Sequence, residues 1–288
     1  MTLSARIVFC LALAGLLPAC SGHKQTLTTS VPPVRKPAIV HRVYVNPDLQ
    51  WVRPLRYQGE QWTLNKVVQT YSDYIEHKFN YYFTEAKISY PPKEIVFVAL
   101  KQEKKLELWA RDDGEFRFIR EYFIMAASGD SGPKLKQGDR QVPEGVYRIV
   151  DLNPNSHYHL SMKLDYPNEF DRIHARREGR KEPGGDIYIH GKSASIGCLA
   201  LGDASIEELF VLVAKVGIDK VKVVIAPHDP RVYPLNAYSD QLPSWTPELY
   251  SMITREIFAL PARGKAVRTD LFAKPYANSS SKPFINSK

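Results

Sequence analysis

The sequence predicts a mainly β fold, either a β-sandwich or an open barrel, with a helix inserted between its strands. Short apolar runs recur from Ile95 to Ile225, and Gly, Pro, Asp and Asn residues that favour turns separate them. Asp112-Asp113-Gly114 has the composition of a hairpin turn. We expect a mostly antiparallel set of strands over residues 95–100, 106–109, 116–119, 123–127, 146–152, 158–164, 187–190 and 221–225.

Helices are predicted before, within and after this set of strands. Residues 62–86 place apolar side chains three and four apart, which makes one helix face that we expect to be core rather than a saccharide-stacking surface: Val68, Tyr71, Ile75, Phe79 and Tyr82. A single helix interrupts the strands, with Asp203 as N-cap, Gly217 at its end and a buried stripe of Ile206, Leu209, Phe210 and Val213. A short helix is predicted over 247–260.

The order of segments predicts an exported protein. An apolar run over residues 7–17 follows Arg6 and is too short to span a bilayer, so residues 1–19 are interpreted as a signal peptide. Residues 20–37 are interpreted as a tether and 38–93 as an N-terminal helical extension. Residues 94–227 would then form the catalytic domain, and 228–288 a C-terminal extension with a disordered tail.

The three cysteines of the chain divide by position. Cys10 lies in the predicted signal peptide, and Leu17-Pro18-Ala19-Cys20 has the form of a lipobox, which makes Cys20 the candidate for lipidation. Cys198 would then have no disulfide partner in an oxidising compartment, which suits a catalytic thiol better than a structural one. The net charge of +8 suits contact with an anionic polymer or a membrane surface.

The segment from Asp186 to Leu201 carries the candidate chemistry. A short apolar strand ends at His190, and a turn rich in Gly and Ser returns the chain to Cys198. A thiol becomes a good nucleophile when a neighbouring base withdraws its proton. We expect Ser195 to shape this loop, and the N–H groups of Gly197 and Cys198 to form an oxyanion hole.

This segment resembles the signature of the L,D-transpeptidase (YkuD) family, in which a strand ending in His-Gly precedes a Ser-x-Gly-Cys loop. The short spacing is most similar to the YafK-like branch, and Val142–Ile149 and His159–Asn168 match further patterns. Family members often carry a His before Gly-Cys and an Arg after it, where this chain has Ile196 and Ala200. The resemblance implies a YkuD-like fold, with Cys198 as nucleophile, His190 as base and the Gly191 carbonyl orienting the imidazole.

Substrate contacts are less specific. The YafK-like segment suggests His159 and Tyr166 as lining residues. Arg177 lies in a basic run that could recognise substrate carboxylates, with a solvated loop as an equal alternative. His157, His159 and His190 could be considered as metal ligands, but no third ligand is spaced along the chain in a way that fixes a metal ion. A papain-like active site is disfavoured because its histidine lies far downstream of the cysteine, whereas His228 follows Cys198 closely. No Walker loop, dinucleotide-binding motif or nucleic-acid module is present, so we expect no metal, no cofactor and no nucleic-acid partner.

The expected function is therefore that of a cysteine acyltransferase acting on diaminopimelate-containing stem peptides of peptidoglycan through a thioester. It would act in the periplasm, held to the outer membrane by a lipid anchor. A hydrolase that uses the same Cys-His site on diaminopimelate-linked peptides or wall-bound lipoprotein is the first alternative. A non-catalytic wall-binding lipoprotein is the second, although such a protein would be expected to have lost His190 or Cys198.

Overall fold

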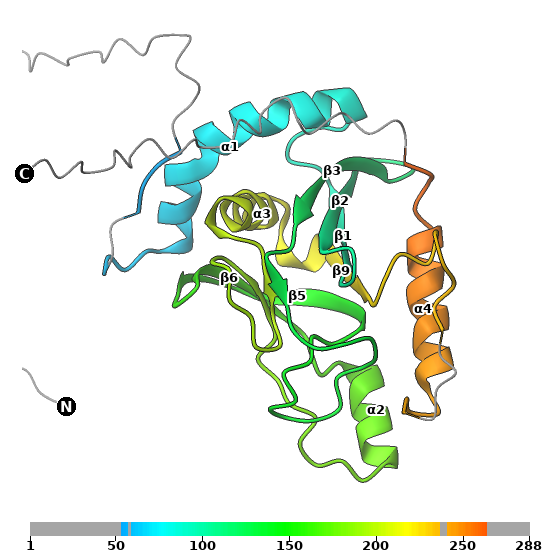
Figure 1. The fold of residues 1–288 in the computed structure, drawn as a ribbon. Helices are drawn as coiled ribbons and strands as arrows, with labels where there is room; N and C mark the ends of the chain where they lie inside the picture. The colour runs from blue at the N-terminus through cyan, green and yellow to red at the C-terminus, as the bar shows by residue number, and fades with distance from the viewer. Residues whose placement is uncertain (1–52, 57–58, 237–240, 264–288) are drawn as a thin grey trace, which may run out of the picture. The chain divides into compact units, whose positions relative to one another are not determined.

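The computed structural model describes residues 53–56, 59–236 and 241–263 (Figure 1). The predicted signal peptide, Cys20, the tether and nearly all of the C-terminal tail lie outside these residues. Within the described ranges, no helix has the length and apolar character that crossing a membrane requires.

Nine strands form the described sheet in the order β3-β2-β1-β9-β5-β6-β7-β8-β4. All neighbouring pairs are antiparallel except β1 with β9 and β7 with β8, which are parallel. The strands are β1 (Glu94–Leu100), β2 (Lys105–Arg111), β3 (Arg117–Phe123), β4 (Ala126–Ala127), β5 (Gly145–Ser156), β6 (His159–Leu164), β7 (Tyr188–His190), β8 (Leu199–Ala200) and β9 (Val221–Ala226).

The sheet bends at β5 and approaches itself at its two ends. Residues 145–148 of β5 pair with β9, whereas the rest of this strand pairs with β6. The terminal strands β3 and β4 follow each other in the chain. Between them, the Ile124 N–H donates to the Lys104 carbonyl beside β2, and the Met125 N–H donates to the Ala200 carbonyl of β8. Both N···O distances are 2.8 Å. The predicted mainly β fold with an open-barrel arrangement is therefore confirmed.

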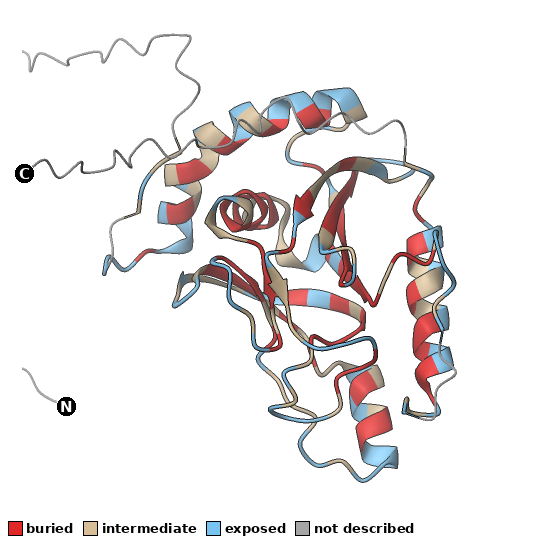
Figure 2. Ribbon diagram, viewed as in Figure 1, coloured by how far each residue is buried: buried red, intermediate tan, exposed pale blue. Residues whose placement is uncertain are grey.

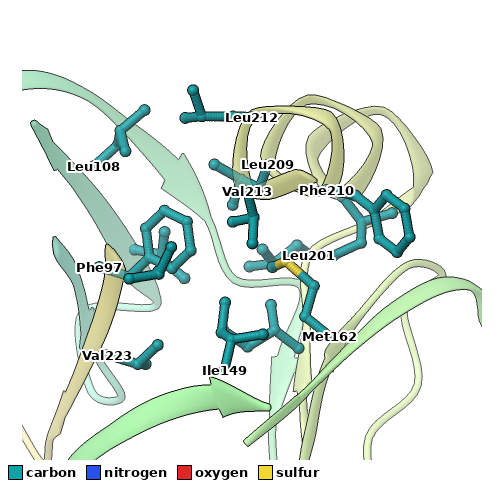
Figure 3. Packing of buried hydrophobic residues seen from close by; sticks show 14 of the residues in the cluster. Phe97, Leu108, Ile149, Met162, Leu201, Leu209, Phe210, Leu212, Val213 and Val223 are labelled. Carbon is teal, nitrogen blue, oxygen red and sulfur yellow. The ribbon is translucent and has the colours of Figure 1, made fainter. Parts of the chain in front are cut away.

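Helix α3 (Asp203–Val216) occupies the space between the two halves of this bent sheet (Figure 1). It is buried along most of its length (Figure 2). Leu209 and Val213 lie among Phe97 and Val223 from one half, and Ile149 and Met162 from the other (Figure 3). Burying this apolar surface is the main source of stability for such a layer.

The two faces of β1 are covered by different helices. Ile95, Phe97 and Ala99 belong to the cluster that includes α3 and α1 (Leu64–Ala86). The alternate residues, beginning at Val96, pack with α4 (Thr246–Phe258). Because successive side chains of a strand point to opposite faces, a continuous apolar run is what a strand covered on both sides requires.

The predicted helices at 62–86, in the sheet and at 247–260 are confirmed, with local corrections. The buried residue near the start of α1 is Val67 rather than Val68, which is half-buried. Gly202 is the N-cap of α3, because the Asp203 carboxylate accepts a hydrogen bond from the Lys192 N–H instead of capping its own helix. The strand predicted over 123–127 is divided, since β3 extends to Phe123 and β4 begins at Ala126.

The prediction of a single inserted helix is wrong, because α2 (Glu169–Arg177) also lies between strands. Asn168 and Asp171 form a capping box at its start. Its buried side includes Asp171 and His174, so polar residues hide the periodicity that would have marked a helix. His174 stacks on Trp245, which precedes α4, with ring centroids 4.6 Å apart.

Helix α1 is attached to α3 and β3 by a buried carboxylate as well as by apolar contacts. Glu208 is buried in α3, and its carboxylate receives hydrogen bonds from Lys78 of α1 at 2.5 Å and from Arg120 and Tyr122 of β3 at 3.0 Å. A buried carboxylate needs such compensation for its lost hydration. The tyrosines Tyr71 and Tyr82 are also buried, so the prediction that they are core residues is confirmed.

We predict that Ile75→Ala lowers the free energy of unfolding by about 2–5 kcal/mol, because Ile75 lies fully buried on the inner face of α1. Tyr81→Ala on the exposed side of the same helix is the matched control and should change it by about 0.5 kcal/mol or less. Urea denaturation followed by circular dichroism measures both. Equal effects of the two substitutions would show that α1 does not stabilise the sheet.

Candidate active site

The pairing of β7 with β8 brings the strand that ends at His190 beside the strand that directly follows Cys198. Ile189 lies opposite Leu199 and His190 opposite Ala200, in parallel register. Continued by one residue, this register sets Cys198 beside Tyr188. Because the pleat alternates, His190 and Cys198 then lie on the same face of the sheet, two residues apart along the strands.

The His190 ring is held in one orientation. Its Nδ1 lies 2.6 Å from the Gly191 carbonyl oxygen, which can only accept a hydrogen bond, so Nδ1 carries the proton and Nε2 keeps its lone pair. The Tyr158 ring covers the imidazole, with ring centroids 4.4 Å apart. Burial lowers the pKa of His190, although the bond to Gly191 opposes this. The imidazole is therefore a neutral base at neutral pH.

The thiol of Cys198 is only partly buried and is also neutral at rest. Burial raises its pKa, while a hydrogen bond from the Tyr188 backbone and the positive charge of Lys134 oppose the rise. The Sγ atom lies 3.9 Å from the Asp186 carbonyl oxygen. Among the hydrogen bonds of the described residues, none joins Sγ to the His190 ring. Such contacts often tighten only when substrate binds.

Two glycines of the loop are required for different reasons. A Cβ on Gly191 would lie 2.6 Å from the Tyr158 carbonyl oxygen and 2.7 Å from an Asp203 carboxylate oxygen, so no side chain fits there. Gly197 has space around it, but its φ of +105° lies in the region that only glycine adopts readily. These constraints hold the residues beside His190 and Cys198 in place.

Two serine hydroxyls hold the loop that carries the thiol. The Ser195 Oγ accepts from the Cys198 N–H at 3.1 Å and donates to the Cys198 carbonyl at 2.6 Å. The Gly197 N–H donates to the Ser128 Oγ at 2.6 Å. The two amides predicted to form an oxyanion hole are thus bonded to serines in the ligand-free protein, and the Ser195 hydroxyl bonds to both backbone groups of Cys198.

The three residues predicted as substrate contacts have other surroundings in the ligand-free structure. The His159 Nε2 lies 2.6 Å from a carboxylate oxygen of the buried Glu207, to which Arg53 also binds. The hydroxyl of the buried Tyr166 donates to the Lys134 and Pro183 carbonyls. Arg177 is exposed in the last turn of α2. The pKa of the nearby His174 is lowered by burial and, less strongly, by the charge of Arg177.

Three residues around the site were not predicted from the sequence: Ser128, Lys134 and Tyr158. Ser128 and Lys134 lie in the loop between β4 and β5, about 60–70 positions before Cys198 in the chain. The Lys134 ammonium is buried and pairs with Asp139. The only local signal was a run of turn-forming residues that includes Lys134 and Lys136, and such a run does not reveal which distant loop it meets.

The described residues contain no group of three His, Cys, Asp or Glu side chains placed to hold a metal ion. Of the histidines considered for such a site, His157 is exposed, and His159 and His190 are bonded to Glu207 and Gly191. The arrangement is that of a neutral thiol beside an oriented neutral imidazole, which suits attack on an electrophilic carbon.

Part of the chain is similar to known proteins. Residues 93–225 match the family model described as the L,D-transpeptidase catalytic domain, YkuD. YafK of Escherichia coli (strain K12), which is provisionally named an L,D-transpeptidase, is 36% identical over 115 residues. This match covers 39% of the present chain and 44% of YafK, so the chain spans less than half of that relative.

Solved structures with part of this fold include the helical cell shape determining protein Pgp2 from Campylobacter jejuni, at 20% identity and a TM-score of 0.39 over 63% of this chain and 77% of that one. L,D-transpeptidase 1 from Mycobacterium tuberculosis has 13% identity and a TM-score of 0.28 over 46% and 62%. Structural similarities with such low TM-scores say nothing about the activity of this chain. Residues 93–225 of the chain are thus similar both to the L,D-transpeptidase (YkuD) catalytic-domain family and to part of YafK.

Proposed function

We propose that this protein is an exported cysteine acyltransferase of the L,D-transpeptidase type, acting on diaminopimelate-containing stem peptides of peptidoglycan through a thioester acyl-enzyme. The observation that carries the proposal is the parallel register of β7 and β8, which sets an oriented His190 and a free Cys198 on one face. The match of residues 93–225 to the L,D-transpeptidase catalytic-domain model supports the wall peptide as substrate.

The proposed reaction begins with transfer of the Cys198 proton to the His190 Nε2. The sulfur forms a bond to the carbonyl carbon of the donor peptide, and the carbonyl π electrons move to oxygen. When the carbonyl re-forms, the C–N bond breaks and the departing amine takes the proton from His190. An amine from a second peptide that attacks the thioester gives a cross-link, whereas water gives hydrolysis.

Two pKa directions define the resting state for this reaction. A lowered pKa keeps His190 deprotonated, and therefore able to accept a proton, below the pH at which an ordinary histidine becomes charged. A raised pKa keeps Cys198 as the thiol at neutral pH. The thiolate must then form during the attack, which makes the imidazole a necessary part of the reaction.

The first prediction of the proposal concerns wall chemistry. Incubation of the wild-type protein with purified sacculi should change the muropeptides, and Cys198→Ala should abolish the change while leaving folding intact, because little volume is lost at a partly exposed position. His190→Ala should lose activity by a factor of about 10²–10⁴, the usual contribution of a positioned base. Chromatography of digested sacculi measures the products.

The products also decide between the proposed reactions. New dimers indicate transpeptidation, and shortened or released peptides indicate the hydrolase alternative. No change with the wild-type protein would support a non-catalytic wall-binding role. Activity that survives in Cys198→Ala would contradict both catalytic forms of the proposal.

A second prediction concerns the ionisation of the thiol. Because burial disfavours the thiolate, alkylation of Cys198 by iodoacetamide should be slow at pH 7 and rise with pH through a midpoint above the ordinary thiol value of about 8.5. Peptide mapping by mass spectrometry follows the Cys198 peptide separately from other cysteines. A midpoint below the ordinary value would indicate a thiolate–imidazolium pair at rest and would contradict the neutral state.

A third prediction concerns location and rests on residues outside the described ranges. If Cys20 is lipidated, the protein should fractionate with membranes, and Cys20→Ser should move it to the soluble exported fraction or leave it uncleaved. Residues 21–37 would provide a tether with a coil dimension on the order of 20–25 Å. A fully soluble wild-type protein with an unmodified Cys20 would indicate a secreted enzyme without an anchor.

A further inference from the structure

We propose that the Ser128 hydroxyl is a catalytic hydrogen-bond donor, which binds the oxygen of the reacting carbonyl as Cys198 attacks. The inference rests on the proposed function only in requiring that the thiol attacks a carbonyl group. It depends on the position of Ser128 relative to Cys198 and on the hydrogen bonds that the surrounding groups already make.

The register of β4 with β8 determines the position of Ser128. These strands are antiparallel, with Ala126 opposite Ala200 and Ala127 opposite Leu199. Continued by one residue, the register sets Ser128 opposite Cys198, so their side chains leave the sheet on the same face. His190 approaches that face from the other side of β8. The thiol therefore lies between the base and the serine, and Ser128 is partly exposed.

The existing hydrogen bonds show which donor remains available. The Cys198 N–H is bonded to the Ser195 Oγ, and the Ser195 proton is directed to the Cys198 carbonyl. The Gly197 N–H is bonded to the Ser128 Oγ. The Ser128 Oγ thus acts as an acceptor in a short bond. Among the hydrogen bonds of the described residues, only the one to the Ser195 Oγ, 3.5 Å away, can take the proton of Ser128. A contact of that length is at the limit of a hydrogen bond.

A weakly engaged hydroxyl in this place is suited to stabilise developing charge. As the C–S bond forms, the carbonyl π electrons move to oxygen, and the Ser128 proton can turn from Ser195 to that oxyanion. The Gly197 N–H polarises the same hydroxyl, because successive hydrogen bonds strengthen one another. A bond to an anion is stronger than one to a neutral oxygen, so the interaction favours the transition state over bound substrate. Collapse of the intermediate expels the leaving group and returns the proton to its resting contact.

Two reagents separate this role from a purely structural one. 4-Nitrophenyl acetate acylates a thiol through a tetrahedral oxyanion, whereas iodoacetamide alkylates the same sulfur by displacement of iodide without one. We expect Ser128→Ala in the full-length protein to slow acylation of Cys198 by a factor of about 10²–10³, the usual effect of losing one oxyanion donor. Alkylation should stay within about twofold of wild type. Ser128→Thr, which keeps the hydroxyl, should recover most of the acylation rate.

Ser195→Ala is the matched control, because the Ser195 hydroxyl holds both the amide and the carbonyl of Cys198. Its loss should slow acylation and alkylation together. Peptide mapping of Cys198 measures both reactions, with Cys198→Ala as the blank. Equal slowing of the two reactions in Ser128→Ala, an unchanged acylation rate, or a wild-type thiol that is alkylated but never acylated would each overturn the proposal.

The same measurements distinguish failure of this inference from failure of the proposed function. The reporter ester requires only a reactive thiol and an oxyanion donor, and no wall peptide. A protein inactive on sacculi that still shows the selective effect of Ser128→Ala would contradict the proposed substrate and retain the catalytic role of Ser128.

Discussion

Strand β5 is the element on which the rest of the structure depends, because both halves of the sheet are hydrogen-bonded to it. Its first residues pair with β9 and its later residues with β6, so the sheet must bend within this one strand. The bend creates a space lined mainly by apolar side chains, and Leu209, Phe210 and Val213 of α3 fill it. The site follows from this arrangement, since β7 pairs with β6, and β8 pairs with β7 and β4.

Burial acts on the two candidate catalytic groups in opposite directions and favours the neutral form of both. It lowers the pKa of His190 and raises that of Cys198. A thiolate–imidazolium pair formed at rest would be more reactive toward any electrophile. In a neutral thiol–imidazole pair, proton transfer becomes favourable only as the sulfur attacks a bound substrate. The Gly191 carbonyl makes this possible by fixing the tautomer, and the contacts around Gly191 in turn connect it to Asp203 at the start of α3.

Three buried carboxylates join the segments on either side of residues 94–227 to the sheet. Glu208 binds Lys78 of α1, and Glu207 binds Arg53. Glu144 accepts hydrogen bonds from Lys101 at 3.0 Å and from Tyr250 of α4 at 2.9 Å, and also from the Gly132 N–H in the loop that carries Ser128. Each carboxylate would be costly to bury without its donors. The division into an extension and a catalytic domain stays a prediction, but α1 and α4 share the apolar clusters of the sheet.

The sequence by itself determined most of the strands, the helices α1, α3 and α4 and the loop that bears Cys198, because each leaves a local pattern of apolar periodicity and turn residues. It did not predict the short strand β8 or the break between β3 and β4. Helix α2 was not predicted, because its buried side includes the polar residues Asp171 and His174 and therefore shows no apolar periodicity. Only the tertiary structure decided which loops surround the thiol: it brings Ser128 to Gly197 and turns His159 toward Glu207. The physical reason is that pairing between β4, β8 and β7 joins residues distant in the chain, and no periodicity within a segment encodes the register of strands that meet from so far apart.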